Sequence, residues 1–433
     1  MGKVKIYLLI ILSVSLILRF CFVFLYPGSV EKDAAQYDAI GWNLVQGEGF
    51  SIEPGVPTVL RGPTYPAFLA FIYSIFGHSY LAVFIVQALL STLTCFMIYL
   101  FGKAIVNQKV GLLAALVTGI YPANVLTVPW IMIETLFTFL LVITIMILTK
   151  AVENKKSLSY LSVGAMLGLL SLCKPTVLLY PVFLLIIIWM LYENRVQCLR
   201  HFIVMLVAFL LVLAPWLIRN QIVSHNFVPM TTNGGRVLWG GNYPLVDGSN
   251  WWPVTDMERL EKMRMEGKEV GRRLLEERQI TDPIEIDEMF RREAIKNILK
   301  NPLGFLKLCL SKVGIFWLSP LEGTYIIRAK SKVLSLVWNL GKYLIVMLAI
   351  IGIIKTTKDW KRFLPIFSVL IYFTVVHALI HSIRRYSYPL LPIASIFVAI
   401  GFSHAMTLLK LRLTREHRKS TLIDYGDEEN RLR

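Results

Sequence analysis

The chain has 433 residues, 56% of them hydrophobic, and a formal net charge of +17. Its mean hydropathy of +0.61 is well above that of an ordinary soluble domain. The basic residues lie in short segments between long apolar runs, which argues against nucleic acid as a partner and is typical of the cytoplasmic loops of a membrane protein. The predicted fold class is therefore an all-α polytopic membrane protein with about ten or more transmembrane helices.

Ten apolar runs are predicted to cross the membrane. Lysine and arginine in the loops near residues 103–109, 150–156 and 355–362 mark one side as cytoplasmic. We therefore expect a multi-pass protein of the plasma or inner membrane, with both termini in the cytoplasm and membrane lipids as partners. The predicted spans lie near residues 6–26, 79–101, 110–122, 126–149, 158–173, 176–192, 201–219, 333–354, 363–381 and 387–409.

The spans divide the chain into four predicted parts. Residues 1–219 form an N-terminal membrane domain whose first outer loop is residues 27–78. Residues 220–332 form an extracytoplasmic loop domain, and residues 333–409 hold the last transmembrane helices. Residues 410–433 are a cytoplasmic tail that we expect to be a disordered polar end.

The second outer loop is predicted to be helical and partly soluble. Thr255-x-x-Glu258 and Asp282-Pro283-x-Glu285 each pair a capping side chain with a third-position glutamate, a signature of helix starts. The apolar stretch 303–320 is interrupted, and the stretch 66–77 of the first loop is too short to cross. We expect both to lie along or dip into the outer membrane surface.

Several carboxylates lie directly after the first apolar run, at the predicted outer membrane surface, although membrane insertion does not require them there. In EKDAAQYDAI (residues 31–40), helical spacing places Asp33, Tyr37 and Ile40 on one face and Asp38 on another. The alternative is a solvated helix start whose acidic first turn the macrodipole favours. Glu134 lies about one and a half turns into an apolar run, and a carboxylate there is either functional or a hydrogen-bond partner for another helix.

Several cations also lie on the outer side, against the usual charge bias. Arg61 stands alone in its loop, and a guanidinium can clamp a phosphate, although an arginine that snorkels to headgroups is equally consistent. Lys174 lies at the outer junction of the fifth and sixth spans. His381, Arg384 and Arg385 lie in the short loop before the last span. An anionic ligand at the outer surface would explain these charges.

The glycine-rich stretch TTNGGRVLWGGNYP, residues 231–244, lacks the residue order of a nucleotide-binding loop. We interpret it as a turn-rich lid that directs Trp239, Asn242 and Tyr243 toward a sugar. The alternative is a packed loop with no ligand. Arg236, in the same stretch, is a further candidate for substrate binding.

Seven segments together carry a family resemblance. The chain resembles the membrane-embedded glycosyltransferases of the C-type (GT-C) fold, most closely the family 39 group. That group includes protein O-mannosyltransferases and the transferase that adds aminoarabinose to lipid A. The segments occur in order between residues 33 and 392: DAAQYDAIGWNLVQGEGF, RGPTYPAFLAFIYSIFG, IET, LCKPT, APWLIRNQ, TTNGGRVLWGGNYP and RRYSYPLLP.

The resemblance implies a sugar transfer from a polyprenyl-phosphate donor on the extracytoplasmic face. It implies that Asp33 is the catalytic carboxylate, that Tyr37 is the aromatic residue following it, and that Arg61 contacts the donor phosphate. Glu134 corresponds to a second acidic position, and Lys174 and the RRYSYP segment correspond to basic positions around the lipid phosphate.

Two departures from the family pattern limit what the resemblance implies. The aminoarabinose transferase carries an acidic residue where this chain has Leu60, which puts a metal site of that pattern in doubt and leaves a divalent metal open as a cofactor. The family's enzymes also tend to be longer, which leaves the acceptor open among lipid, protein and polysaccharide.

The predicted mechanism is a single displacement with inversion, in which Asp33 acts as general base and the cations neutralise the departing phosphate. Glu134 would orient the sugar or assist the base. Two other classes stay open: a lipid-linked glycan transporter or flippase, and a non-catalytic scaffold. No internal repeat is visible, and the spans divide unequally around the second loop, which argues against a transporter.

Overall fold

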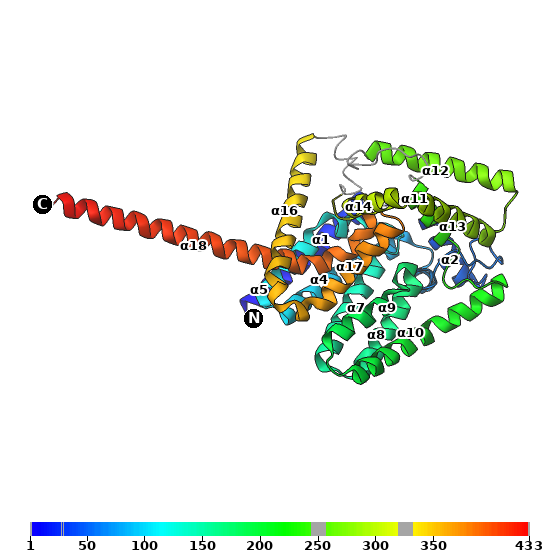
Figure 1. Cartoon of the computed structure of the whole chain (residues 1–433), viewed down its shortest axis with the longest axis horizontal. Helices are drawn as coiled ribbons and strands as arrows, with labels where there is room; N and C mark the ends of the chain where they lie inside the picture. Colours follow the sequence, from blue (N-terminus) through cyan, green and yellow to red (C-terminus); the bar gives the residue numbers. More distant parts are fainter. Residues whose placement is uncertain (1, 27, 29, 244–256, 319–331, 432–433) are drawn as a thin grey trace.

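The computed structural model of the chain is a bundle of apolar helices with a smaller group of helices at one end (Figure 1). The structure describes residues 2–26, 28, 30–243, 257–318 and 332–431. Within these ranges, the only β contact is an isolated bridge between Ser51 and Pro57. The all-α fold class predicted from the sequence is confirmed.

Each of the ten predicted spans falls on a helix. Six stretches are long and apolar enough to cross a membrane: Lys3–Leu25, Tyr80–Ile105, Glu134–Asn154, Arg195–Ser224, Tyr343–Leu379 and Arg384–Leu411. The chain is therefore a multi-pass membrane protein. The helices are α1 (Lys3–Leu25), α4 (Tyr80–Ile105), α5 (Gln108–Ile120), α7 (Glu134–Asn154), α8 (Ser157–Cys173), α9 (Tyr180–Leu191), α10 (Arg195–Ser224), α16 (Lys332–Thr356), α17 (Trp360–Leu379) and α18 (Leu391–Arg431).

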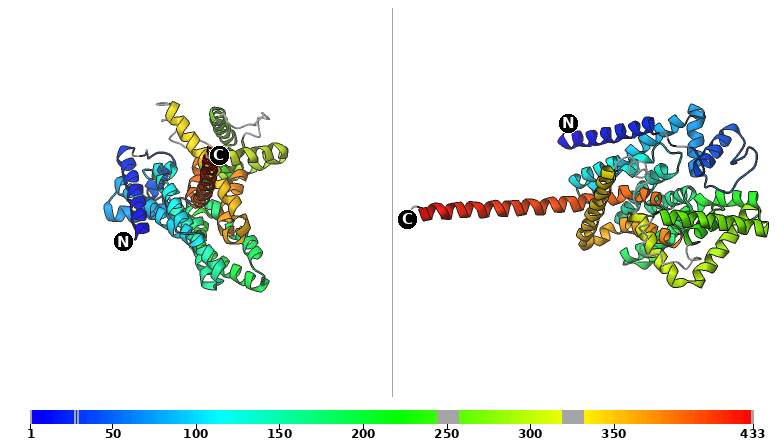
Figure 2. Two further views of the ribbon diagram at one scale, coloured as in Figure 1. Left: turned by 90° about the vertical axis from the view of Figure 1, so that its left-hand side faces the viewer. Right: turned by 90° about the horizontal axis from the view of Figure 1, so that it is seen from above.

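Two predictions about these helices are wrong. The span predicted for 126–149 starts later, because the short helix α6 (Pro122–Leu126) and a turn precede α7. Glu134 is therefore the first residue of α7 and does not lie inside a continuous apolar helix. The tail predicted to be disordered continues α18 as far as Arg431 and projects away from the bundle (Figures 1 and 2). The tail holds no proline, the residue that most strongly interrupts a helix.

Small residues set how closely the membrane helices pack. A Cβ atom added to Gly164 of α8 would lie 2.0 Å from the carbonyl oxygen of Met205 in α10. A Cβ added to Gly352 of α16 would lie 1.9 Å from the carbonyl oxygen of Phe397 in α18. Only glycine permits these backbone approaches, which is how helices associate where both solvent and side chains are apolar.

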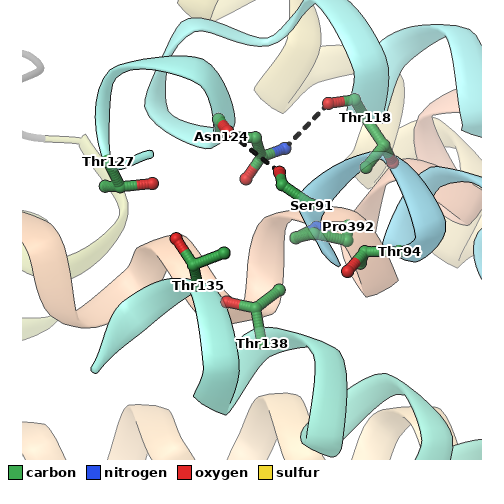
Figure 3. A pocket seen from close by; sticks show the side chains of 8 residues that line it. All are labelled: Ser91, Thr94, Thr118, Asn124, Thr127, Thr135, Thr138 and Pro392. Carbon is green, nitrogen blue, oxygen red and sulfur yellow. Dashed lines mark hydrogen bonds between the residues drawn. The ribbon is translucent and has the colours of Figure 1, made fainter. Parts of the chain in front are cut away.

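A buried arginine links three helices inside the bundle. Arg19 of α1 is 0% exposed. Its guanidinium donates hydrogen bonds to Ser15, to Ser91 of α4 at 2.8 Å and to the carbonyl of Gly119 in α5 at 2.9 Å. Beside Ser91 lies a small cavity lined mainly by hydroxyl groups (Figure 3). Its lining residues are Ser91, Thr94, Thr118, Asn124, Thr127, Thr135, Thr138 and Pro392.

The two large loops form the group of helices at one end of the bundle. The first loop folds into α2 (Asp33–Gln46) and α3 (Thr64–Phe76), which pack against each other. The second contains α11 (Gly234–Asn242), α12 (Met257–Arg278), α13 (Pro283–Lys300) and α14 (Pro302–Leu318). Asp282 caps α13 through the backbone N–H groups of residues 284 and 285, as predicted. The other predicted cap, Thr255, lies outside the described residues.

Helix α14 runs antiparallel to the end of α17. The Lys312 ammonium donates to the carbonyl of Ile380 at 3.2 Å, and one and a half turns further the Trp317 indole donates to Thr374 at 3.0 Å. Residues further along α14 thus contact residues of α17 that lie further from the C-terminal end of α17. This pairing is that of a helix that dips alongside a transmembrane helix, although its depth in a bilayer stays a prediction.

Replacing Gly164 with valine tests the contact between α8 and α10. Because the added side chain would overlap the Met205 carbonyl, we expect Gly164→Val to destabilise the protein by about 1–3 kcal/mol or more. Thermal unfolding in detergent measures this. Gly314→Val is the control, because a Cβ at Gly314 of α14 has no atom within 4 Å. Equal melting temperatures for the two variants would contradict the packing argument.

Candidate active site

Helix α2 places Asp33 at the edge of the bundle. The helix begins at Asp33, so this carboxylate lies at the positive end of the helix macrodipole. Tyr37, one turn later, is buried, and its ring meets the ring of Tyr65 in α3 edge to face at 5.2 Å between centroids. Burial raises the pKa of Tyr37 above its ordinary value, so its hydroxyl stays protonated. Packing through Tyr37 fixes the face of α2 that carries Asp33.

The Asp33 carboxylate is shared between two guanidinium groups. Arg61 donates to Oδ1 at 2.6 Å, and Arg385 donates to Oδ2 at 2.9 Å. Arg61 is further held by the amide oxygen of Gln36 at 2.6 and 2.9 Å and lies over the Tyr37 ring at 5.0 Å. The three charged residues come from the first loop and from the loop before α18, so the fold joins segments that are far apart in sequence.

The two ion pairs decide the protonation of Asp33. Burial alone would raise the pKa of its carboxyl, but the charges of Arg61 and Arg385 outweigh burial and lower that pKa below the ordinary value near 3.8. The ion pairs therefore stabilise the folded protein at pH values above the ordinary pKa. This contribution is lost as the pH falls through the lowered pKa of the folded state.

Glu134 lies on the other side of Arg385. Its Oε1 is 3.6 Å from Arg385 Nε, which is an ion-pair distance but too long for a hydrogen bond. Glu134 is 3% exposed, and its Oε2 has no hydrogen-bond partner among the described residues. As the first residue of α7 it also lies at the positive end of that helix's macrodipole. The site thus contains a buried carboxylate oxygen that is available to a hydroxyl group.

Lys174 adds a buried cation next to this pair. It follows α8, directly before the 3-10 turn η1 (Pro175–Val177), and is 7% exposed. Its ammonium lies 4.4 Å from the centroid of the Tyr386 ring and 5.5 Å from that of Phe137, and none of the described residues accepts a hydrogen bond from it. Aromatic faces stabilise a cation but leave its N–H groups available to a ligand.

The remaining candidate site residues lie in two places, the loop that contains Arg385 and helix α11. His381 and Arg384 belong to the same loop as Arg385. Arg384 is the first residue of the 3-10 helix η4 (Arg384–Leu390), and His381 precedes that helix. The centroid of the His381 ring is 6.0 Å from that of the Tyr386 ring. Arg236 is exposed on α11. No contact between described residues joins Arg236 or Asn242 to Asp33.

The glycine-rich stretch is not the turn-rich lid that the sequence predicts. It forms helix α11, in which Trp239 is buried against Phe290 of α13. The Asn242 amide donates to the carbonyl of Ile380 at 3.1 Å and accepts from Lys312 at 2.7 Å. The alternative of a packed segment fits better, because the aromatic and amide groups are used in helix packing.

Three sets of contacts in or beside the site were not predicted from the sequence. Gln36 fixes Arg61, and its position one turn after Asp33 could have indicated it. Asp38 accepts hydrogen bonds from three side chains, and its face was predicted but its partners were not. The buried ring of His377 stacks on Tyr386 at 4.7 Å, and no sequence signal indicated that contact.

The carboxylates of the site do not form a ligand set for a metal ion. Asp33 and Glu134 both lie against guanidinium groups. Across the part of the chain that the structure describes, no group of three or more His, Cys, Asp or Glu residues is arranged to hold one. The residues present therefore do not fit a divalent metal at this site.

The fold matches that of C-type membrane glycosyltransferases. The archaeal oligosaccharyltransferase AglB from Archaeoglobus fulgidus, in complex with an inhibitory peptide and a dolichol-phosphate, superimposes with a TM-score of 0.55 at 13% identity over 96% of this chain and 52% of that chain. This chain thus spans about half the length of AglB. ArnT from Cupriavidus metallidurans bound to undecaprenyl phosphate matches with a TM-score of 0.45 at 12% identity, over 92% of this chain and 78% of that chain.

A family comparison agrees with the fold. Residues 60–218 match the family model described as dolichyl-phosphate-mannose-protein mannosyltransferase. This range contains Arg61, Glu134 and Lys174, whereas Asp33 and Arg385 lie outside it. No curated protein sequence matches the chain. The resemblance to the GT-C glycosyltransferases, predicted from the sequence, is confirmed.

Removing one guanidinium should change how Asp33 titrates. In Arg61→Met, burial still disfavours the carboxylate while one of its two ion pairs is lost, so we expect the pKa of Asp33 to rise. Infrared difference titration of the protonated carboxyl band measures this, and Asp33→Asn identifies the band. The matched control is Arg236→Met, which removes an exposed arginine from α11. An Asp33 titration that is unchanged in Arg61→Met would contradict the assigned ion pair.

Proposed function

We propose that the protein is an integral membrane glycosyltransferase that moves a sugar from a polyprenyl-phosphate donor to an acceptor on the extracytoplasmic side. The observation that carries this proposal is the carboxylate of Asp33, shared between Arg61 and Arg385 beside the buried pair Glu134 and Lys174. Three cations and two carboxylates meet there, so one positive charge is in excess. A phosphate placed there would be neutralised by groups that are already oriented.

The donor phosphate and the Asp33 carboxylate compete for the same guanidinium groups. Without donor, Asp33 acts as the counterion of Arg61 and Arg385, and its lowered pKa makes it a weak base. When the phosphate takes over the guanidinium N–H groups, Asp33 loses its hydrogen bonds to them and its pKa rises. Binding of the donor would therefore generate the base at the moment it is needed.

The reaction we propose is a single displacement at the anomeric carbon. An Asp33 oxygen accepts the proton of the acceptor hydroxyl or amine, and the freed electron pair forms the new bond to the anomeric carbon. The bond from that carbon to the phosphate oxygen breaks, and the polyprenyl phosphate leaves with its electron pair. Arg61, Arg385 and Lys174 neutralise the charge that develops on it. Attack from the face opposite the phosphate inverts the anomeric configuration.

Glu134 is suited to hold the sugar. Its Oε2 has no partner among the described residues, and a sugar hydroxyl that donates to it would satisfy a buried acceptor. Arg385 lies between Glu134 and Asp33 and so would separate the sugar-binding group from the base. The hydroxyl of Tyr37 stays protonated, and the Tyr37 ring packs against the Arg61 guanidinium.

The membrane setting supports a lipid-linked donor. The site lies where α1, α8 and α17 end and where α4, α7 and α18 begin, at one end of the bundle, while both chain termini lie toward the other end (Figures 1 and 2). We place the termini in the cytoplasm, from the basic loops, and the site on the extracytoplasmic side. AglB, which shares the fold, was solved with dolichol-phosphate, a polyprenyl-type phosphate.

Asp33→Asn tests the base directly. The variant keeps the size of the side chain but removes its basicity, so we expect sugar transfer to fall by about 10²–10⁴-fold. The assay is release of sugar from a polyprenyl-phosphate donor in detergent, where no gradient can drive transport. Glu48→Gln is the matched control, because it neutralises an exposed carboxylate of the same loop. Full activity of Asp33→Asn would contradict the assignment, and wild-type protein that only moves intact donor across vesicles would identify a flippase instead.

Lys174→Met tests the phosphate site. Methionine keeps the packing against Phe137 and Tyr386 but removes the buried charge. A hydrogen bond to a charged group contributes about 1.5–3 kcal/mol, so we expect the KM for the donor to rise roughly 10–150-fold. Lys150→Met at the opposite end of α7 removes an exposed lysine and should leave KM unchanged. If the two variants have the same KM, Lys174 does not contact the donor.

A further inference from the structure

A second carboxylate of α2 is buried on a different face of the helix from Asp33. Asp38 is 8% exposed and accepts three hydrogen bonds. Tyr73 of α3 and His78 contact its Oδ1 at 2.6 and 2.8 Å, and Tyr80 of α4 contacts its Oδ2 at 2.8 Å. The mechanism proposed above makes no use of this group. A buried carboxylate is costly unless its oxygens are satisfied, so all three donors matter to it.

The backbone before α2 and its N-cap residue do not by themselves stabilise the start of the helix. Lys32 precedes the helix with a φ of 54° and a ψ of −117°, an uncommon conformation for a non-glycine residue. No side chain caps the first turn. A helix with an uncapped end depends on contacts along its length to stay in place. Asp38 provides such contacts to α3, to the following turn and to α4 at once.

The ring of His78 extends this attachment. It stacks on Trp42, one turn after Asp38 on the same helix, with 4.7 Å between ring centroids and 14° between planes. It also meets the Tyr73 ring edge to face at 4.9 Å. The cluster of Asp38, Trp42, Tyr73, His78 and Tyr80 therefore joins three consecutive helices through one carboxylate.

We propose that Asp38 is a positioning residue that holds α2 against α3 and α4 so that Asp33 lies between Arg61 and Arg385. Asp38 does not touch the reacting atoms and acts through the helix. The consequence for catalysis rests on the proposed function, whereas the consequence for the position of α2 does not. Helical geometry transmits the constraint, because Asp33 is only five residues from Asp38 on the same helix.

Hydrogen exchange of the full-length protein tests the positioning role without any substrate. Asp38→Asn replaces one acceptor oxygen with an NH₂ group, which then faces a tyrosine or histidine donor. We expect the amides of α2 to exchange about tenfold faster or more, while those of α4 keep their wild-type rates. Tyr80→Phe removes one donor of the three and should give a smaller increase. Glu48→Gln is the matched control.

Kinetics test the consequence for the reaction. Because a displacement of about 1 Å can cost about 10²-fold in rate, we expect kcat of Asp38→Asn to fall roughly 10–100-fold while KM for the donor stays near wild type. Tyr80→Phe should give a smaller loss that parallels its exchange rate. If the α2 amides of Asp38→Asn exchange hydrogen at wild-type rates, the proposal is wrong, and it is also wrong if kcat falls while those rates stay unchanged. If the wild-type protein transferred no sugar, the proposed function would fail and the exchange result alone would decide the position of α2.

Discussion

The ion pairs of Asp33 with Arg61 and Arg385 are the interaction on which the rest of the site depends. One carboxylate joins the first loop to the loop before α18, across 352 residues of sequence. Glu134 and Lys174 then complete a cluster of three cations and two carboxylates. The cluster carries one positive charge in excess, and in the proposed function the phosphate of a membrane lipid balances it.

The loop helices hold the basic side of this cluster in place. Lys312 of α14 and Asn242 of α11 bond to each other, and both donate to the carbonyl of Ile380 at the end of α17. The residues that follow lead directly to Arg385. The carboxylate side is held separately, through α2 and its contacts with α3. Asp33 and Arg385 are thus held by different segments of the chain, and both segments must be folded for the two side chains to meet.

Much of the fold could be read from the sequence, because long apolar runs and basic loops follow from bilayer physics. The isolated charges at the predicted outer ends of the helices could also be identified, since the cations among them oppose the usual bias. Contacts between distant elements could not be, which is why Arg19 in the bundle and the three donors around Asp38 were missed. The late start of α7 placed Glu134 differently from the prediction, because hydropathy does not distinguish a helix from an apolar turn. Trp239 was predicted to face a sugar, but its ring lies in the hydrophobic core formed by the helices of the second loop.

In the proposed mechanism, a lipid phosphate replaces Asp33 on the two guanidinium groups. A structure of the protein determined with bound polyprenyl phosphate measures this most directly. We expect phosphate oxygens within hydrogen-bond distance of both Arg61 and Arg385, with the Asp33 carboxylate released from at least one of them and facing the sugar position. A phosphate bound elsewhere, with both Asp33 ion pairs still at the distances of the free protein, would contradict it.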